Sequence, residues 1–505
     1  MSLKKNILAN YASQIYVSLV GIAILPLYLR HMGAEAYGLV GFFALLQSWF
    51  SLLDMGLSTT MAREAARFQG GAVAAVTLRQ LLRALEAIFV MIAFAGAISV
   101  IFGAHVLSTH WLKVTILNYS EVASAIQIMG VILAFRWISG LFRSVINGFE
   151  KQVWLSWFNA LIATLRFVGV IPIFVYVGSS PKIFFTYQMI VALFELGVLI
   201  FTAYLILPKL ATPLPLKWDW RPLKPILKFS LSISFLSVVW VLSTQTDKLI
   251  LSKFLSLSDY GYFTMAVMAA SGIMLISSPI STAILPRLTR LHAEGREDEV
   301  IALYRRGTQV VSALAFSTAM VLVFFAKQVL WIWTGNLELS EKVDSVLILY
   351  ALGNAVLAVA AFPYYLQYAM GDMRLHIYGN ILFLVFLIPS VVWLTVQYGM
   401  PGAGWAWLCS NAIYLFLWIP VVHHKFARGM HWKWLVSDIL PFLLLATTSA
   451  FLTSSIDSVP NGKIHLIVNI ATSSVVVLSF TLSGLGLNLL RRKISLMFWG
   501  KSKAP

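Results

Sequence analysis

Stretches of about 20 apolar residues recur along this chain from end to end, each long enough to cross a bilayer core of roughly 30 Å as a helix. Of the 505 residues, 59% are hydrophobic and only 11% are charged, whereas soluble domains carry about 25% charged residues. The sequence lacks the short alternating segments that mark the strands of a membrane barrel. It therefore predicts an all-α integral membrane protein.

The apolar stretches divide the chain into about fourteen predicted membrane-spanning helices. No loop between them is long enough to hold a soluble domain. The predicted spans are 8–29, 37–61, 84–104, 122–142, 153–177, 183–207, 229–252, 261–285, 307–326, 345–369, 376–397, 403–424, 437–456 and 465–489.

The formal net charge of +17 raises the question of a nucleic-acid partner. With the predicted spans, most of the 37 Lys and Arg residues fall in loops and tails on one side of the membrane. Cytoplasmic loops carry such an excess, so the basic charge reflects topology and indicates no nucleic acid. We expect an even number of spans in the cell inner (cytoplasmic) membrane, with both termini cytoplasmic. The single cysteine, Cys409, excludes an internal disulfide.

Two parts of the chain repeat the same residues at a constant offset of 223 positions. The pairs are Tyr37-Gly38 with Tyr260-Gly261, Ser58-Thr59 with Ser281-Thr282, Arg67 with Arg290, and Arg30 with Lys253. Six predicted spans separate the copies, so both copies have the same orientation, as in transporters built from parallel repeats. We expect two six-helix lobes, 1–207 and 229–425, facing each other across a central cleft. A cytoplasmic linker, 208–228, joins them, and 426–505 adds two helices and a basic cytoplasmic tail.

Six charged residues lie inside the predicted spans, where a charge costs about 2.5–3.5 kcal/mol on insertion scales and usually faces a bundle interior or a wet cavity. They are Asp54, Arg136, Arg166, Glu195, Asp247 and Lys248. Arg166 and Glu195 lie near the middle of their spans, and a structural ion pair between them is one interpretation. The other is functional, because all six lie in the first seven spans and the interiors of the last seven carry none.

A cationic cleft with titratable carboxylates suits an anionic substrate and ion coupling. Under this hypothesis the substrate-binding residues are Arg136, Arg166, Lys248 and Arg30. The candidates for ion coupling or cavity carboxylates are Asp54, Glu195 and Asp247, with Asp54 first because its own span holds no basic neighbour.

Other features of the sequence indicate less. Five tryptophans could stack on sugar rings, although interfacial aromatic belts explain most of them: Trp157, Trp240, Trp393, Trp405 and Trp407. His423-His424 is interpreted as an interfacial pair at a helix end, since no metal-ligand spacing accompanies it. The sequence shows neither a P-loop nor a convincing nucleophile constellation. We therefore expect no cofactor, no bound metal and no enzymatic activity.

Two segments resemble a known family. "GAEAYGLVGFFALLQSWFSLLDMGLSTTMAREAAR", Gly33 to Arg67, resembles the second span and following cytoplasmic segment of polysaccharide flippases. These belong to the multidrug/oligosaccharidyl-lipid/polysaccharide exporter superfamily, in the branch of the Wzx-type O-antigen translocases. "PISTAILPRLTRLHAEGRED", Pro279 to Asp298, is similar to the matching segment of the second half. The resemblance implies two six-helix lobes, alternating access and a lipid-linked oligosaccharide carried on undecaprenyl diphosphate.

The resemblance also offers a reason for Asp54. Its helix is expected to line the cleft, the Ser-Thr-Thr run after it can satisfy backbone groups near the helix end, and Gly56 suggests a flexible point near an inner gate. The partners expected are the lipid-linked substrate, membrane lipids, a coupling cation (proton or sodium) and other glycan-assembly membrane proteins.

Two alternatives to a flippase stay open. A drug/cation antiporter of the same superfamily would favour a cleft dominated by acids, whereas Arg136, Arg166 and Lys248 favour an anion. A membrane-embedded glycan polymerase or ligase would be expected to show a large external catalytic loop, which the sequence lacks.

Overall fold

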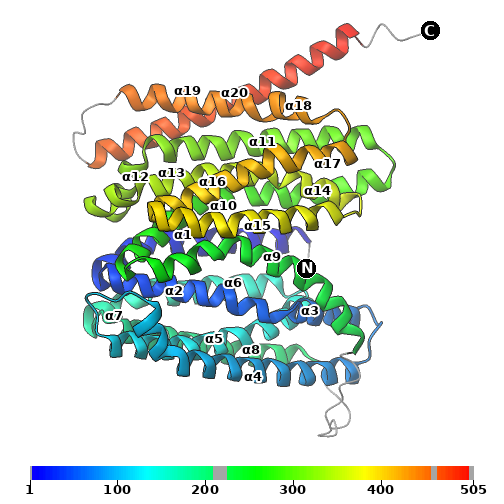
Figure 1. Cartoon of the computed structure of the whole chain (residues 1–505). Helices are drawn as coiled ribbons and strands as arrows, with labels where there is room; N and C mark the ends of the chain where they lie inside the picture. The colour runs from blue at the N-terminus through cyan, green and yellow to red at the C-terminus, as the bar shows by residue number, and fades with distance from the viewer. Residues whose placement is uncertain (1–2, 209–223, 457–462, 500–505) are drawn as a thin grey trace. The chain divides into compact units, whose positions relative to one another are not determined.

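The computed structural model describes residues 3–208, 224–456 and 463–499, and in these residues the chain forms helices joined by short turns (Figure 1). It divides into two compact units, Met1–Gly261 and Tyr262–Pro505. The predicted linker 208–228 lies largely outside the described residues. The division into lobes at 207 and 229 stays a prediction.

The first unit holds nine α-helices, a 3₁₀-helix (η1) and two π-helices (η2, η3) in its described residues. They are α1 (Leu3–Met32), α2 (Ala34–Phe50), η1 (Ser51–Asp54), α3 (Leu57–Gln69), α4 (Ala75–Val106), η2 (Leu107–Trp111), α5 (Tyr119–Gly148), α6 (Gln152–Ala163), η3 (Thr164–Val168), α7 (Val170–Tyr176), α8 (Pro181–Ile206) and α9 (Lys224–Phe254). Helix α10 (Leu257–Ala293) begins in this unit and continues into the second.

The second unit contains two further π-helices, η5 and η6, in its described residues. Its elements after α10 are α11 (Glu297–Phe324), α12 (Ala326–Thr334), α13 (Leu337–Ala360), α14 (Phe362–Ala369), α15 (Arg374–Tyr398), α16 (Met400–Ile413), η5 (Tyr414–Trp418), α17 (Ile419–Phe426), α18 (His431–Trp434), η6 (Leu435–Ile439), α19 (Leu440–Ile456) and α20 (Lys463–Trp499).

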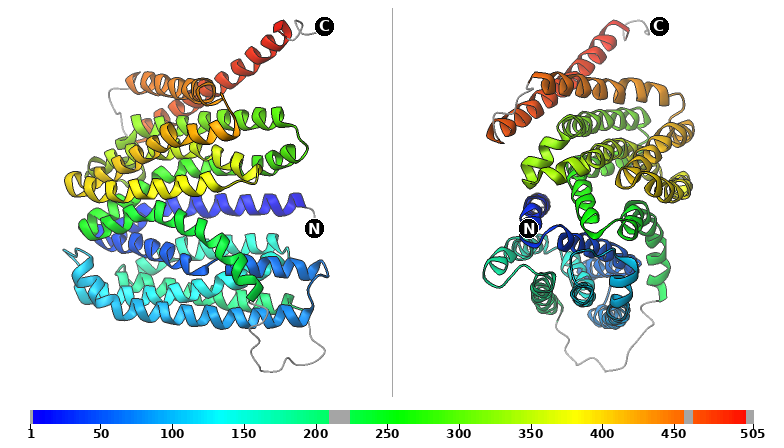
Figure 2. Two further views of the ribbon diagram at one scale, coloured as in Figure 1. Left: turned by 45° about the vertical axis from the view of Figure 1, so that its right-hand side comes forward. Right: turned by 60° about the vertical axis from the view of Figure 1, so that its left-hand side comes forward.

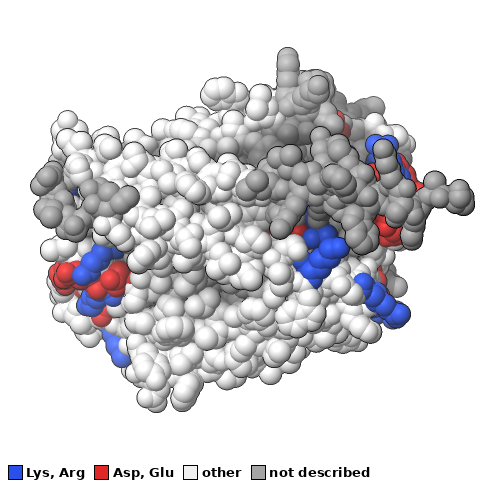
Figure 3. Space-filling view, turned by 90° about the horizontal axis from the view of Figure 1, so that it is seen from above, with Lys and Arg blue, Asp and Glu red and all other residues white. Residues whose placement is uncertain are grey.

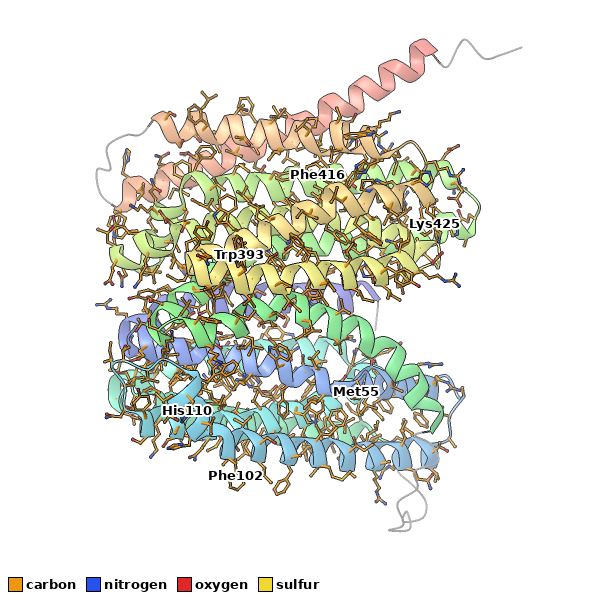
Figure 4. The ribbon with its side chains drawn as sticks, viewed as in Figure 1. Met55, Phe102, His110, Trp393, Phe416 and Lys425 are labelled. Atoms are coloured by element: carbon orange, nitrogen blue, oxygen red, sulfur yellow. The ribbon has the colours of Figure 1, made fainter. Side chains whose placement is uncertain are left out.

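Thirteen helical stretches of the described residues are long and apolar enough to cross a membrane. They coincide with thirteen of the predicted spans, and the remaining one, 229–252, falls within α9. Apolar side chains such as Phe102, Trp393 and Phe416 are exposed on the helices (Figure 4). On the face seen in Figure 3, the charged side chains gather at two opposite ends and leave an uncharged band between them. The all-α membrane fold is confirmed.

Each unit has its own core. In the first, α5 packs between α4 and α8 and also contacts α3 (Figure 1). The buried side chains there include Leu85, Leu141 and Val145. In the second, α11 packs against α13, α19 and α20, and α16 packs against α13 and α15 (Figure 2). The two helices beyond the predicted repeat, α19 and α20, therefore pack on the second unit through α11.

The predicted span 37–61 is not one continuous helix. Helix α2 ends at Phe50, η1 ends at Asp54, and Met55 and Gly56 both adopt left-handed backbone conformations, with φ of 44° and 71°, before α3 begins. Glycine tolerates this conformation, whereas for Met55 it carries a steric cost. Figure 4 shows Met55 at the junction of the two helices. The Asp-Met-Gly sequence therefore ends η1 and redirects the chain into α3.

The repeated Tyr-Gly motifs meet within the first unit. Gly38 of α2 lies against the start of α10, where a Cβ atom added to it would clash with the carbonyl oxygen of Leu257. A Cβ atom added to Gly261 would lie 2.8 Å from the carbonyl oxygen of Ala34. Only glycine permits backbones to approach this closely. The two copies of the motif therefore pack against each other, and this contact requires glycine in both.

The loop after η2 fixes this crossing. The buried carboxylate of Glu35, at the start of α2, accepts backbone N–H groups from Thr115, Ile116 and Leu117 at 2.5–2.7 Å. In the same loop, the carbonyl oxygen of Lys113 accepts the N–H of Leu257 at 2.9 Å. The loop thus joins the start of α2 to the start of α10.

Candidate functional site

Three arginines and one glutamate meet inside the first unit, and we call Arg136, Arg143, Arg166 and Glu195 the arginine cluster. Glu195, on α8, is buried, with its side chain 2% exposed. Its two carboxylate oxygens accept hydrogen bonds from Arg143 of α5 and Arg166 of η3. The predicted Arg166–Glu195 pair is therefore present in the structure, with Arg143 as a second cation.

Arg136 completes the cluster from α5, one heptad before Arg143. It donates to Gln47 Oε1 at 2.7 Å and to Gln188 Oε1 at 3.4 Å, and its guanidinium carbon lies 4.9 Å from the ring centre of Phe43. The Gln188 side chain in turn donates to the Arg166 carbonyl at 2.8 Å. The side-chain amide of Gln188 thus links Arg136 to Arg166, and so to the ion pairs that Glu195 makes.

The backbone around Arg166 is widened into a π-helix, a form that is rare and frequent at functional sites. Widening changes the partners of the carbonyl groups, and buried carbonyls need donor partners. Tyr28 donates to the carbonyls of Arg166 and Phe167 at 3.1 and 3.0 Å, and Tyr187 donates to that of Leu165 at 2.8 Å. Side chains from α1 and α8 therefore hold η3, and with it Arg166, in place.

Two guanidinium nitrogens of the cluster have no partner among the described residues. The Nε atoms of Arg136 and Arg166 are buried and make no hydrogen bond there. A buried donor without an acceptor costs about 1–3 kcal/mol. With three guanidinium groups against one carboxylate, the cluster carries a formal surplus of two positive charges. An anionic ligand would supply both the acceptors and the countercharge.

Asp54 lies at the helix break and not in the arginine cluster. Its Oδ1 atom accepts the backbone N–H of Ser58 at 3.2 Å and the Ser58 hydroxyl at 2.6 Å. These bonds cap the first turn of α3, where backbone N–H groups lack helical partners. The hydroxyls of Thr59 and Thr60 bond to the Gly56 carbonyl, at 2.8 and 2.9 Å, as expected for the Ser-Thr-Thr run.

The other predicted site residues lie elsewhere in the first unit. Lys248, on α9, donates to the Thr244 carbonyl at 2.6 Å and lies 3.3 Å from the buried carboxylate of its neighbour Asp247. Arg30 is exposed at the end of α1. Arg30, Asp54 and the Asp247–Lys248 pair are therefore not members of the arginine cluster. The cluster therefore contains Arg136, Arg166 and Glu195 from the predicted set.

Sequence reasoning placed Arg143 in a cytoplasmic loop, because the predicted span ended at 142. The structure continues α5 to Gly148, so Arg143 lies within the helix. A seven-residue spacing from Arg136 puts both arginines on one helix face. That spacing is the feature of the sequence that could have placed Arg143 beside Arg136.

The second unit also holds a buried charge pair, near the ends of its predicted spans. Asp438, in η6, is fully buried and accepts two hydrogen bonds from Arg305, at 2.5 and 2.8 Å, and one from Gln309 at 2.5 Å. No sequence pattern indicates this pair, because Arg305 and Asp438 lie near span ends on separate helices. Of the five tryptophans, Trp407 is buried and donates to Asn354 at 3.0 Å, and the other four are exposed.

Comparisons with known proteins give a family and a fold. A family model described as "Polysaccharide biosynthesis protein" matches residues 3–292. No curated protein sequence matches the chain. The solved structure of "Lipid II flippase MurJ, inward closed conformation" is similar at a TM-score of 0.72 and 14% identity, over 95% of this chain and 98% of that one.

Two multidrug transporters have related structures. An inward-facing multidrug resistance transporter of the MATE family, in the MOP superfamily, is similar at a TM-score of 0.62 and 13% identity, covering 82% of this chain and 94% of its own. The MATE multidrug transporter DinF-BH, solved as a complex, is similar at 0.59 and 14%, covering 86% and 97%. At such identities the likeness shows a shared fold.

Proposed function

Because the chain belongs to the polysaccharide biosynthesis protein family, we propose that it is a flippase for a lipid-linked oligosaccharide. The substrate is an undecaprenyl-diphosphate-linked repeat unit of O-antigen lipopolysaccharide, capsule or exopolysaccharide. It moves from the inner to the outer leaflet of the cell inner membrane by alternating access. The polar head cannot cross hydrocarbon unaided, whereas the lipid tail can stay in the bilayer. The fold shared with a lipid II flippase supports a substrate of this kind.

The arginine cluster is the observation that carries the proposal. Guanidinium groups bind phosphate oxygens through paired N–H donors, and Arg136 and Arg166 each keep one donor without a partner among the described residues. Gln47, which bonds Arg136, is exposed although it lies in a membrane span. Polar groups in spans face a bundle interior or a water-filled cavity. The cluster is therefore proposed to bind the diphosphate from such a cavity through Arg136 and Arg166.

Flipping of a fluorescent lipid-linked oligosaccharide in proteoliposomes tests this role. We expect Arg166→Ala to lower the rate at least about tenfold, equivalent to about 1.4 kcal/mol, while the protein still inserts. Arg166→Lys should retain part of the activity, since lysine supplies charge without the planar fork. Arg296→Ala, a change in an exposed loop, is the matched control. Normal flipping by an Arg166→Ala, Glu195→Ala double variant would instead assign the pair a structural role.

The alternative of a drug/cation antiporter predicts a site in which acids exceed bases. The fold shared with MATE transporters is compatible with it, but the excess of arginine over glutamate in the cluster favours an anion. Stimulation of transport by a lipid-linked diphosphate, and not by organic cations, would separate the two.

The direction of flipping rests on the proposed orientation, with both termini cytoplasmic. In a Cys409→Ser background, a cysteine placed at Ile116 should react with an impermeant thiol reagent from outside whole cells. Ile116 is 80% exposed in the loop after η2. A cysteine at Gly295, in the α10–α11 turn, should react only after the cells are opened. The reverse pattern would overturn the orientation and the direction together.

Energy for the cycle is proposed to come from a proton or sodium ion moving inward. One charge crossing a 100 mV potential supplies about 2.3 kcal/mol. Asp54 is the first candidate for the coupling carboxylate, because Glu195 and Asp247 each bond a basic side chain. If imposed proton and sodium gradients both leave the flipping rate in proteoliposomes unchanged, this coupling is excluded.

A further inference from the structure

A buried histidine in the second unit has polar partners on both sides of its ring. His423, on α17, lies with Nδ1 3.0 Å from Nδ1 of His431, on α18, and with Nε2 2.8 Å from the Tyr304 hydroxyl of α11. The neighbouring His424 is exposed. Both histidines lie in the last turn of α17, at a helix end as predicted, but only His423 is buried in the helix packing. We call His423 and His431 the histidine pair.

The histidine pair belongs to a contact that holds α18 and η6 onto α11. Trp434, fully buried between them, lies 4.9 Å from the His423 ring centre and donates its indole N–H to Thr308 at 3.0 Å. One turn further on, Asp438 of η6 bonds to Arg305 of α11. A polar seam thus joins α11 to the segment that leads into α19 and α20.

The bond between the rings fixes the number of protons the histidine pair can hold. Two Nδ1 atoms at 3.0 Å form a hydrogen bond only when one of them carries a proton and the other does not. The Tyr304 hydroxyl can donate to His423 Nε2 or accept from it, so a first added proton can enter there with both bonds kept. A second added proton places N–H groups face to face and breaks the bond between the rings.

We propose that the histidine pair is a proton-binding site that holds α18 and η6 on α11 and α17, and that full protonation releases them. Histidine is the side chain whose ordinary titration lies between about pH 5 and pH 8. The proposal concerns the packing of the last two helices and does not depend on the transported substrate.

The negative charges near the histidine pair are already bonded to other groups, so they do not compensate the positive charge of a second added proton. Asp438, the carboxylate of the polar seam, already accepts bonds from Arg305 and Gln309, and Lys425 is bonded to Asp372. The groups on the packed elements are Glu297, Asp298, Glu299, Tyr304, Arg305 and Arg306 of α11, Tyr364 and Tyr365 of α14, His424 and Lys425 of α17, Lys433 of α18 and Asp438 of η6. Glu297 and Glu299 bond to His292 and Arg296, so these carboxylates already have cationic partners.

Hydrogen exchange of the full-length protein in lipid nanodiscs tests the proposal. Peptides covering Met430–Leu440 should lose about tenfold in protection, after correction for intrinsic exchange, between about pH 7.5 and about pH 3. Peptides from α4 should not change and serve as the internal reference. His424→Gln, a change one residue away at an exposed position, should leave the response intact.

The variants decide the outcome. His431→Gln, at a half-buried position, removes the ring that carries the second proton, so the acid-induced loss should disappear. His423→Gln should give the same result from the other ring. A wild-type protein with equal protection at both pH values, or a His431→Gln protein that responds like wild type, would overturn the proposal. Neither result bears on flipping, so its failure and that of the proposed function are distinguishable.

Discussion

Glu195 has two arginine partners, one from each of two elements, and this arrangement has a consequence for single substitutions. Removing either Arg143 or Arg166 leaves the carboxylate with one cation, so no unpaired charge remains buried. Loss of function in either single variant would therefore report on ligand binding and not on folding. This separation makes the cluster accessible to mutational analysis.

The double variant should behave differently. Arg143→Ala with Arg166→Ala strands a carboxylate that is 2% exposed, and an unpaired buried charge costs about 3–5 kcal/mol. We expect a clearly lower midpoint in thermal unfolding of the detergent-solubilised protein, whereas each single variant stays close to wild type. Glu195→Gln should restore the midpoint of the double variant. Equal midpoints for single and double variants would show that Arg136 or water replaces both partners.

At this scale the sequence supports part of the site. Arg166 and Glu195 could be predicted because a charge in the middle of an apolar span needs a partner. Arg143 follows the predicted span 122–142 by one residue. Hydropathy does not place the end of a span to within one residue, so it could not show that Arg143 lies inside the helix with Arg166 and Glu195. The amides of Gln47 and Gln188 look unremarkable in sequence, because their role depends on which helices are neighbours.

At the scale of single elements, the break after α2 is the feature most open to test. Asp54 caps α3 through Ser58 and is also the first candidate for ion coupling. Asparagine keeps an oxygen that can accept from Ser58 but removes the charge, whereas alanine removes both.

The two substitutions therefore separate the roles. We expect Asp54→Ala to destabilise the protein by about 0.5–2 kcal/mol, the usual effect of losing a helix cap, as read from thermal unfolding. Asp54→Asn should keep wild-type stability and lose the response of flipping to an ion gradient. An Asp54→Asn protein that still responds would leave Asp54 with the capping role alone.

The π-helices mark the limit of sequence reasoning about elements. Spans 153–177 and 437–456 were predicted as regular helices, and both contain a π-turn with a charged residue, the half-buried Arg166 and the fully buried Asp438. The apolar pattern fixes where a helix crosses the membrane. The widening depends on donors from other helices, such as Tyr28 and Tyr187, and these contacts are set only when the helices pack.

At the scale of the whole molecule, membrane character and the positions of the long apolar stretches follow from hydropathy alone. The repeat was also visible, yet its physical reason was not, because nothing in a sequence shows that two distant Tyr-Gly motifs touch. The structure supplies the reason in the crossing of Gly38 with the start of α10.

This crossing predicts matched effects from separate substitutions. Gly38→Ala and Gly261→Ala each place a methyl group against backbone that cannot yield cheaply, and we expect about 1–3 kcal/mol of destabilisation from each. Gly103→Ala and Gly272→Ala are the controls, since a Cβ atom there meets nothing within 4 Å. Membrane accumulation and thermal unfolding provide the measurement. A stable Gly38→Ala protein would show that the helices separate without cost.

The contact at the crossing is also reciprocal. Gly38 meets the carbonyl of Leu257, and Gly261 meets the carbonyl of Ala34, while the 223-residue offset that relates the two glycines also relates Ala34 to Leu257. Each glycine thus contacts the residue that corresponds to the other glycine's partner. Two identical subunits contact each other in this way across an isologous interface. One chain therefore contains, within its first unit, the kind of symmetric contact that two identical subunits make with each other.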